Sequence, residues 1–260
     1  MIKYLYMKNY INWKLFFILL GLSLISIICV FPYVLTLQGE LLKKIGQPIW
    51  IIFVAQLIQS IILFSIAIFF GLFFTNKVGF KLPFIEAILE KRDYKIILKD
   101  ILGKSVLFGI ATAVIIYGLD TLFTLGGSAI STHQSYAPIW QKLLAAFYGG
   151  STEEILLRLF LMTLFIWISM KLFKKSEPSR VGIIVSIFLA AIIFGLGHLP
   201  LTASLTKLNT LIVVRAVVLN GIGGIIFGWL FWKKGLESAM IAHFTTDIFL
   251  LTLFPLLFGL

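Results

Sequence analysis

The sequence predicts an all-α fold, a polytopic membrane helix bundle of about seven or eight transmembrane helices. Of its 260 residues, 60% are hydrophobic and 13% are charged, and the mean hydropathy is +1.05. Soluble domains are closer to half apolar and a quarter charged. Apolar runs of about 20 residues, the length of a helix that crosses a bilayer, recur along the whole chain. We therefore expect residues 1–260 to form a single transmembrane domain.

Seven apolar runs are long enough to cross a membrane as helices. They cover residues 15–37, 49–74, 105–125, 148–172, 181–198, 211–232 and 236–257. The first run follows Lys3, Lys8 and Lys14. It is too long for the apolar region of a signal peptide, and no small-residue cleavage site follows it. We therefore expect it to be retained as the first span.

Residues 77–104 form the one long polar connection between the expected spans. Apolar Phe84, Ile85, Ile88 and Leu89 recur there at helical spacing among charged residues. This pattern is typical of amphipathic helices, and it predicts a helical pair that lies at the membrane surface. Binding of a partner protein is an alternative role for the same surface.

The Lys and Arg residues, which give the chain a net charge of +11, lie mostly in short segments beside apolar runs. This placement indicates contact with anionic lipid rather than with nucleic acid. Alternate connections carry most of the basic charge, and the others hold only Lys43, Lys44, Lys142 and Lys207. By the positive-inside rule, we expect a multi-pass protein of the cell membrane with a cytoplasmic N-terminus. The Phe-, Ile- and Lys-rich composition is typical of a bacterial protein.

The stretch 137–173 is too long for one ordinary span, and it contains Gly149-Gly150 just before two acidic residues. We expect a break or a re-entrant segment at the glycines, because irregular backbone is tolerated at membrane depth where it lines a protein cavity. Ser151 or Thr152 would then cap the next helix. The acidic pair would lie in the first turn of that helix, near the positive end of its dipole.

Ionisable residues inside the expected spans are the main functional signal, because a charge at the bilayer centre costs about 2.5–3.5 kcal/mol. The first group is Glu153-Glu154-x-x-x-Arg158. Glu154 and Arg158 are four residues apart on one helix face, so we expect an ion pair. Glu153 points about 100° away and would face a cavity. The alternative is a purely structural ion pair that locks two helices together.

Two further groups contain histidine. Phe194 and His198 share one helix face near the end of the fifth span. Gly195 and Gly197 would allow close approach of another element, and Pro200 would end the helix. Alternatively, His198 is an interfacial residue held by a hydrogen bond.

His243 and Asp247 lie four residues apart on one face of the last span, where the Asp can orient the ring and fix its tautomer. The span before it carries small residues that predict tight helix packing. These are Gly221, Gly223, Gly224 and Gly228. Arg215 could extend to the membrane interface, contact lipid or pair with an acid, and of these we expect an internal pair. We expect Asp120 and His133 to be solvated.

These ionisable residues lie in three separate spans and would normally face a shared interior. Glu153, His198 and His243 form a proton-transfer set that can activate water, with other polar groups left to stabilise an oxyanion. The same three side chains are also a ligand set suited to zinc.

The order E-E-x-x-x-R, F-x-x-x-H and H-x-x-x-D or H-x-x-x-N resembles the CPBP family of intramembrane glutamate proteases. This family includes type II CAAX prenyl endopeptidases and bacteriocin-immunity homologues. The motifs run from Glu153 to Asp247, within an expected motif-bearing core of about residues 138–257. The resemblance implies a helical intramembrane endopeptidase that cleaves a peptide or a membrane-anchored protein tail, without a cofactor or a metal.

By this resemblance, the catalytic residues are Glu153, Glu154, His198, His243 and Asp247. Glu153 activates water with the aid of His198, and His243 binds the oxyanion together with the residue at position 247. Glu154 and Arg158 hold the site together, and Phe194 packs beside it. The prenyl endopeptidases carry Asn at the last position. Ionised Asp247 cannot donate a hydrogen bond to an oxyanion, so it must be protonated or act by orienting His243.

Other functions stay open at this point. The same fold can serve a non-catalytic bacteriocin-immunity or scaffold protein. A proton-coupled transporter is disfavoured because no internal repeat is visible and the charges cluster in one half. A zinc protease would use Glu153, His198 and His243 as ligands. The expected partners are a peptide or membrane-protein substrate and membrane lipid.

Overall fold

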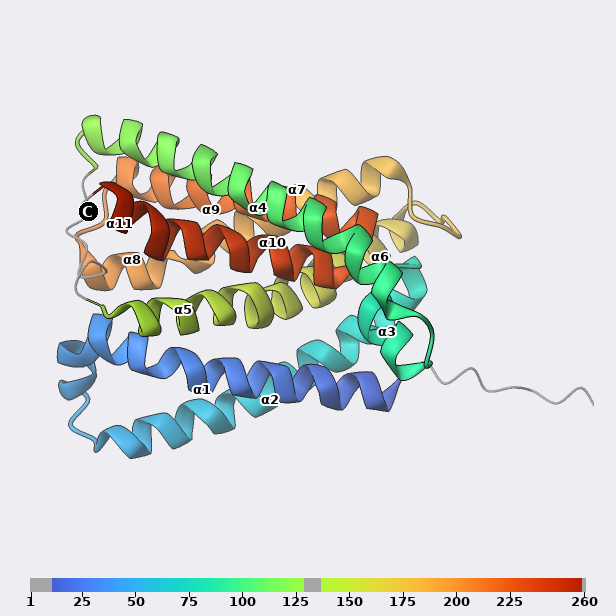
Figure 1. Cartoon of the computed structure of the whole chain (residues 1–260), viewed down its shortest axis with the longest axis horizontal. Coiled ribbons are helices and arrows are strands. Elements are labelled where there is room, and N and C mark those ends of the chain that lie inside the picture. Colours follow the sequence, from blue (N-terminus) through green and yellow to red (C-terminus); the bar gives the residue numbers. More distant parts are fainter. Residues whose placement is uncertain (1–10, 129–136, 259–260) are drawn as a thin grey trace, which may run out of the picture.

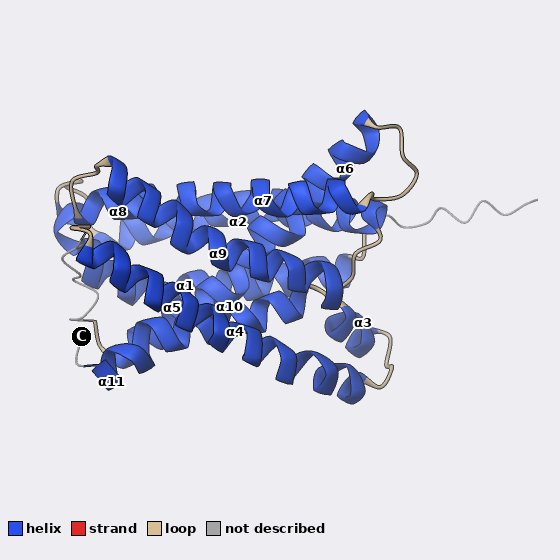
Figure 2. Cartoon of the chain, turned by 90° about the horizontal axis from the view of Figure 1, so that it is seen from above, coloured by secondary structure: helices blue, strands red, loops and turns tan. Residues whose placement is uncertain are grey.

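The computed structural model describes residues 11–128 and 137–258 and shows long helices that run roughly side by side along the longest axis (Figure 1). No strand occurs within these residues. Seen from above, the same helices pack in more than one layer, with the short helices at the ends of the bundle (Figure 2). The expected all-α bundle is confirmed. Lys3, Lys8 and His133 lie outside the described residues.

The helices follow one another in the order below. They are α1 (Trp13–Lys43), α2 (Ile49–Val78), α3 (Pro83–Leu89), α4 (Tyr94–Leu125), α5 (Ile139–Tyr148), the π-helical segments η2 (Gly149–Glu153) and η3 (Ile155–Met162), α6 (Thr163–Leu172), α7 (Arg180–Gly197), α8 (Leu199–Leu205), α9 (Thr210–Lys234), α10 (Leu236–Ile248), the π-helical η4 (Phe249–Leu253) and α11 (Phe254–Phe258).

Within the described residues, seven helical stretches are long and apolar enough to cross a membrane, which makes this a multi-pass membrane protein. They cover Trp13–Lys43, Ile49–Val78, Tyr94–Leu125, Ile139–Leu172, Arg180–Leu205, Thr210–Lys234 and Leu236–Phe258. Each contains one of the seven apolar runs of the sequence. Many large apolar side chains on these helices are exposed on the outside of the bundle, as lipid contact requires.

The polar connection 77–104 differs from the expected pair of surface helices. Its first helix is present as α3, with Ala87 buried. The second is absent, because residues from Tyr94 onward belong to the first turns of the continuous helix α4. Asp93 caps this helix by accepting a hydrogen bond from the Lys95 amide at 2.9 Å. The N-cap Asp93, twelve residues before the apolar run that begins at Ser105, therefore sets the helix start.

The helix break expected at Gly149-Gly150 is also wrong. The backbone stays helical from Ile139 to Leu172 and passes through η2 and η3 instead of ending. The capping role of Ser151 fails as well, because its hydroxyl donates back to the Phe147 carbonyl at 2.5 Å. Thr152 instead contacts Ser26 of α1. The acidic pair is thus mid-helix, without the benefit of a helix N-terminus.

The two glycines are explained by contact with α10. A Cβ on Gly150 would lie 2.7 Å from the Phe244 Cβ and 2.9 Å from the Met240 carbonyl oxygen. The backbones of η2 and α10 therefore approach each other as closely as small residues in membrane helices allow. Gly-Gly here brings two helices together, and it does not interrupt one.

Other glycines bring α9 against α7, as the sequence predicts. A Cβ on Gly224 would lie 2.7 Å from the Ala191 Cβ, and one on Gly195 would lie 2.7 Å from the Val217 Cα. Gly228 meets Ile187 at 3.2 Å. Gly197, by contrast, has nothing within 4 Å, so its expected role in close packing is wrong.

The start of α10 lies beneath α3. The Glu237 carboxylate accepts a hydrogen bond from the Ile85 amide at 2.9 Å, and Leu236 and Ser238 are fully buried. Because α10 begins inside the bundle, the residues along it are displaced away from the end that carries α3. This offset decides the depth at which His243 lies.

Candidate functional site

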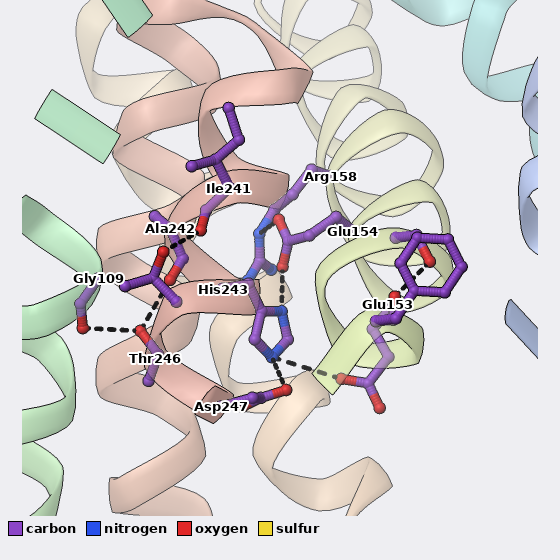
Figure 3. A network of polar contacts seen from close by, with 12 residues as sticks. Gly109, Glu153, Glu154, Arg158, Ile241, Ala242, His243, Thr246 and Asp247 are labelled. Atoms are coloured by element: carbon purple, nitrogen blue, oxygen red, sulfur yellow. Dashed lines mark hydrogen bonds and ion pairs between the residues drawn. The ribbon is translucent and has the colours of Figure 1, made fainter. Parts of the chain in front are cut away.

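His243 is the centre of a polar network that joins α10 to the helix Ile139–Leu172 (Figure 3). Its Nδ1 donates a hydrogen bond to Glu154 Oε1 at 2.9 Å. Its Nε2 lies 3.7 Å from Glu153 Oε2 and 3.6 Å from Asp247 Oδ2. Figure 3 shows Glu154 on one side of the ring and Glu153 with Asp247 on the other. One imidazole therefore contacts all three acidic residues that the motifs contain.

Glu154 forms the expected ion pair with Arg158, with Glu154 Oε2 3.1 Å from the guanidinium Nε. Both side chains are 0% exposed. Among the described residues, the Arg158 nitrogens make no regular hydrogen bond. The guanidinium instead lies 5.6 Å from the Phe194 ring centre and 6.0 Å from that of Phe227, which are cation–π distances. Glu154 is thus fully buried, and its contacts within the site are with His243 and Arg158.

Glu153 and Asp247 are the accessible carboxylates. Their side chains are 23% and 22% exposed, whereas His243 is 6% exposed. The adjacent residues Glu153 and Glu154 therefore face different surroundings, as their expected angular separation predicts. A carboxylate that meets open space can contact water and substrate, and a sealed carboxylate cannot.

His198 approaches the same region from the end of α7. Its Nδ1 donates to the Phe194 carbonyl at 2.9 Å. Since a carbonyl oxygen only accepts, the neutral ring carries its proton on Nδ1 and keeps a lone pair on Nε2. The Phe194 ring lies 4.7 Å from the His198 ring and 5.7 Å from the His243 ring, edge-on to both. The Phe194 ring therefore packs against both histidine rings.

Glu153, His198, His243 and Asp247 all line one cavity of about 430 Å³. The sequence places His198 near one end of its span and His243 near the opposite end, so they would meet only across tilted, broken or offset helices. The buried start of α10 supplies the offset. Pro200 contributes as well, because it lies in the first turn of α8 and lets α7 end at Gly197 beside the cavity.

Gly149 makes room for the cluster. A Cβ at this position would collide with Asp247 Oδ2 and would lie 3.2 Å from His243 Nε2. The carboxylate and the imidazole edge therefore occupy the space that any other residue at position 149 would fill. The π-helical segments η2 and η3 on either side of Glu154 carry both acidic residues into contact with one ring, which suits the frequent location of π-bulges at functional sites.

Several polar residues that line the cavity escape sequence analysis, and Tyr33 and Asn220 are two of them. Tyr33 of α1 is 7% exposed, and its hydroxyl has no hydrogen-bond partner among the described residues. Asn220 of α9 lines the same cavity and donates its amide to the Ala216 carbonyl at 2.8 Å. A lone tyrosine in an apolar run is a weak signal of a functional site, because the hydroxyl of a buried tyrosine usually has a structural hydrogen-bond partner. Only the tertiary contacts show that this one faces the acidic cluster.

Asp120 and Arg215 form a separate ion pair. Arg215 Nε donates to Asp120 Oδ1 at 2.6 Å and ties α9 to α4. The internal pair expected for Arg215 is confirmed, and Asp120, expected to be solvated, is 34% exposed and is also the partner of Arg215. Neither residue lines the cavity. In residues 11–128 and 137–258, no group of three His, Cys, Asp or Glu side chains has an arrangement that could hold a metal ion.

Comparison with protein families shows a similarity over the second half of the chain. A family described as type II CAAX prenyl endopeptidase Rce1-like matches residues 135–249, which contain all three motifs. A search of curated proteins and a search of solved structures found no match to the chain. The family match confirms the resemblance that the motifs indicate, and residues 135–249 are the part of the chain that is similar to the Rce1-like family.

Proposed function

We propose that this membrane protein of the CAAX-protease type is an intramembrane endopeptidase, in which Glu153 activates water to cleave a peptide or a membrane-anchored protein tail. One observation carries the proposal. Glu153, His198, His243 and Asp247 converge from three spans on a single cavity of about 430 Å³, and the Glu154–Arg158 pair supports them from behind. The cost of burying such groups in a membrane favours a use for them.

In the proposed reaction, the Glu153 carboxylate accepts a proton from water as the water oxygen attacks the carbonyl carbon of the scissile amide. The carbonyl π electrons move to oxygen and form a tetrahedral oxyanion. Collapse of this intermediate breaks the C–N bond, and the departing nitrogen takes the proton held by Glu153. One amide and one water become one carboxylic acid and one amine, so atoms and protons balance.

His198 is proposed to assist as a second base. Its Nδ1–H is held by the Phe194 carbonyl, which leaves Nε2 as the nitrogen that can accept a proton. This arrangement orients the ring before substrate binds. A preorganised ring contributes more to a proton transfer than one that must first rotate.

The oxyanion needs hydrogen-bond donors, and an ionised carboxylate supplies none. His243 in its protonated form carries an N–H on Nε2, which lies between Glu153 and Asp247. Tyr33 offers a neutral hydroxyl in the same cavity with no partner of its own. We assign these two groups to oxyanion binding and Asp247 to holding the His243 ring.

The proposal is tested with purified protein and a pool of internally quenched peptides of mixed sequence. Glu153→Gln should lower the rate of cleavage by about 10²-fold to 10⁴-fold, the range for loss of a general base. Glu177→Gln, on the loop between α6 and α7, is the matched control and should cleave normally. Unchanged cleavage by folded Glu153→Gln would remove this residue from the mechanism. Equal thermal unfolding of the two variants excludes misfolding as the cause.

A further inference from the structure

The cavity lies toward one end of the bundle. Because consecutive spans run in opposite directions, some helices contribute their C-terminal part to it and others their N-terminal part. It is lined by the C-terminal part of α1, the N-terminal part of α2, the C-terminal part of α4 and the middle of α9. Tyr33, Gln38, Gln56, Ile116 and Leu219 represent these four segments. The lining parts of α1, α2 and α4 lie toward the end of the bundle that carries α8 and α11 and away from α3 (Figure 1).

The opposite end of the bundle carries the basic charge. The end of α2, the start of α4, the end of α6, the start of α7 and the end of α9 meet there beside α3. Their basic residues include Lys77, Lys81, Lys95, Lys99, Lys104, Lys171, Lys174, Lys175, Arg180, Lys233 and Lys234. The cavity end holds fewer basic residues among those described: Lys43, Lys44, Lys142, Lys207 and Arg215, the last of which is paired with Asp120. By the positive-inside rule, the basic end is cytoplasmic.

The site is closed toward the basic end. Behind His243 lie Glu154 and Arg158, both without exposure, and then a buried apolar layer. That layer contains Leu159, Met162, Leu230, Phe231, Ala239 and Ala242, each at most 1% exposed. A peptide therefore has no path to Glu153 from the cytoplasmic end. Its path runs through the residues that line the cavity, at the lysine-poor end.

We infer that the active-site cavity opens to the outer face of the membrane and accepts a neutral or cationic peptide segment presented from that side. This inference rests on the proposed function. The preference for a neutral or cationic segment follows from the charged side chains that line the cavity. Glu153 and Asp247 are the accessible acidic groups, and no Lys or Arg is among the described residues that line the cavity.

Two carboxylates, with a protonated His243, a neutral His198 and no Lys or Arg among the described lining residues, give the cavity a net negative charge that repels a carboxylate near the scissile bond. A substrate cleaved close to its own free C-terminus brings such a carboxylate. An internal segment of a longer chain does not, and basic side chains within it would be attracted to Glu153 and Asp247. Apolar residues such as Val34, Leu37 and Leu251, which also line the cavity, would contact its apolar side chains.

Single cysteines test the side on which the cavity opens. The natural Cys29 is first replaced by Ser, and then Gln38→Cys and Leu201→Cys each place a thiol at the cavity. Ile97→Cys is the matched control, because Ile97 is a half-buried aliphatic residue that lines a groove at the basic end. A membrane-impermeant maleimide is applied to intact cells and, separately, to disrupted cells.

The inference predicts that the two cavity cysteines are labelled on intact cells and that Ile97→Cys is labelled only after disruption. The reverse pattern would overturn it. An epitope inserted after Lys207 provides a second measure that does not depend on thiol reactivity, since it lies at the same end as the cavity. Detection of this epitope only after disruption would also overturn the inference.

Labelling does not depend on turnover, so the two proposals fail separately. If Glu153→Gln retains full cleavage while the labelling pattern holds, only the enzymatic proposal falls. If the wild type cleaves and the cavity proves cytoplasmic, only the outward opening falls. For the charge preference, internally quenched peptides with Lys beside the scissile bond should be cleaved at least about 10-fold faster than matched peptides with Glu there. Equal rates would contradict it.

Discussion

His243 Nδ1 lies 2.9 Å from Glu154 Oε1, although 89 residues separate the two along the chain. Glu154 in turn lies 3.1 Å from Arg158. The ring that faces the cavity is thus held by a carboxylate that no substrate can reach. A sealed carboxylate that orients a histidine through its second nitrogen is the arrangement by which proteins fix a tautomer and a ring position.

Loss of Glu154 should harm both folding and catalysis. Glu154→Leu leaves the buried Arg158 charge without a partner, which costs about 3–5 kcal/mol. The double variant Glu154→Leu with Arg158→Leu removes both charges and should recover most of the stability. It should still fail to cleave, because His243 has lost its acceptor. Thermal unfolding and peptide cleavage are measured on the same preparations, and full activity of the double variant would show that Glu154 serves charge balance alone.

Gly149→Ala should damage the site and leave the fold intact. The added methyl group would collide with the Asp247 carboxylate and approach His243 Nε2. We expect cleavage to fall at least about 10²-fold, the effect of a misplacement of about 1 Å near the reacting groups. Gly118→Ala, where nothing lies within 4 Å of the new Cβ, is the control and should cleave like the wild type. Equal activity of the two variants would contradict the packing argument.

Asp247→Asn and Asp247→Ala should separate two roles of this residue. Asn keeps the shape and adds an N–H donor, so cleavage should stay within about 10-fold of the wild type or rise. Ala removes the group beside His243 Nε2 and should lower cleavage about 10²-fold to 10³-fold. If Asn inactivates as strongly as Ala does, Asp247 acts by accepting a proton, and its assignment as a support for the ring is wrong.

Tyr33→Phe should lower activity without lowering stability. The hydroxyl is buried and makes no hydrogen bond within the described residues, so its removal leaves no group newly unsatisfied. Loss of one oxyanion donor should lower kcat about 10²-fold to 10³-fold, with little change in KM. Tyr117→Phe, on α4 beside Phe254 and Phe258, is the control. A fall in unfolding temperature with unchanged kcat would assign Tyr33 a structural role.

Much of the fold is predictable from local patterns. A bilayer leaves few ways to satisfy backbone hydrogen bonds, so an apolar run of sufficient length implies a helix. All seven runs form such helices within the described residues. Boundaries are less predictable, because α4 begins at the Asp93 cap and passes through residues whose polarity suggests a surface element. Polar side chains are compatible both with a separate surface helix and with the first turns of a spanning helix, and tertiary packing decides between the two.

The candidate site is predictable only in part. Spacing alone identifies the Glu154–Arg158 pair, because residues four apart on a helix are neighbours. The same reasoning fails at Gly149-Gly150, where a glycine pair suits a helix break as well as a close helix crossing. The contact with Phe244 and Asp247, which lie about 95 residues further along the chain, selects the second. Tyr33 is unpredictable for the same reason.

By itself, the sequence determined that the protein spans a membrane and that it carries ionisable groups there at a cost that implies a use. It also determined which of them share a helix face, since that depends on helical geometry alone. Only the tertiary structure decided that His243 contacts three carboxylates, that Glu154 is sealed while Glu153 is accessible, and that the cavity lies at the lysine-poor end. These properties depend on how far each helix is displaced along its neighbours, and side-chain packing between helices, not the periodicity within one, sets that displacement.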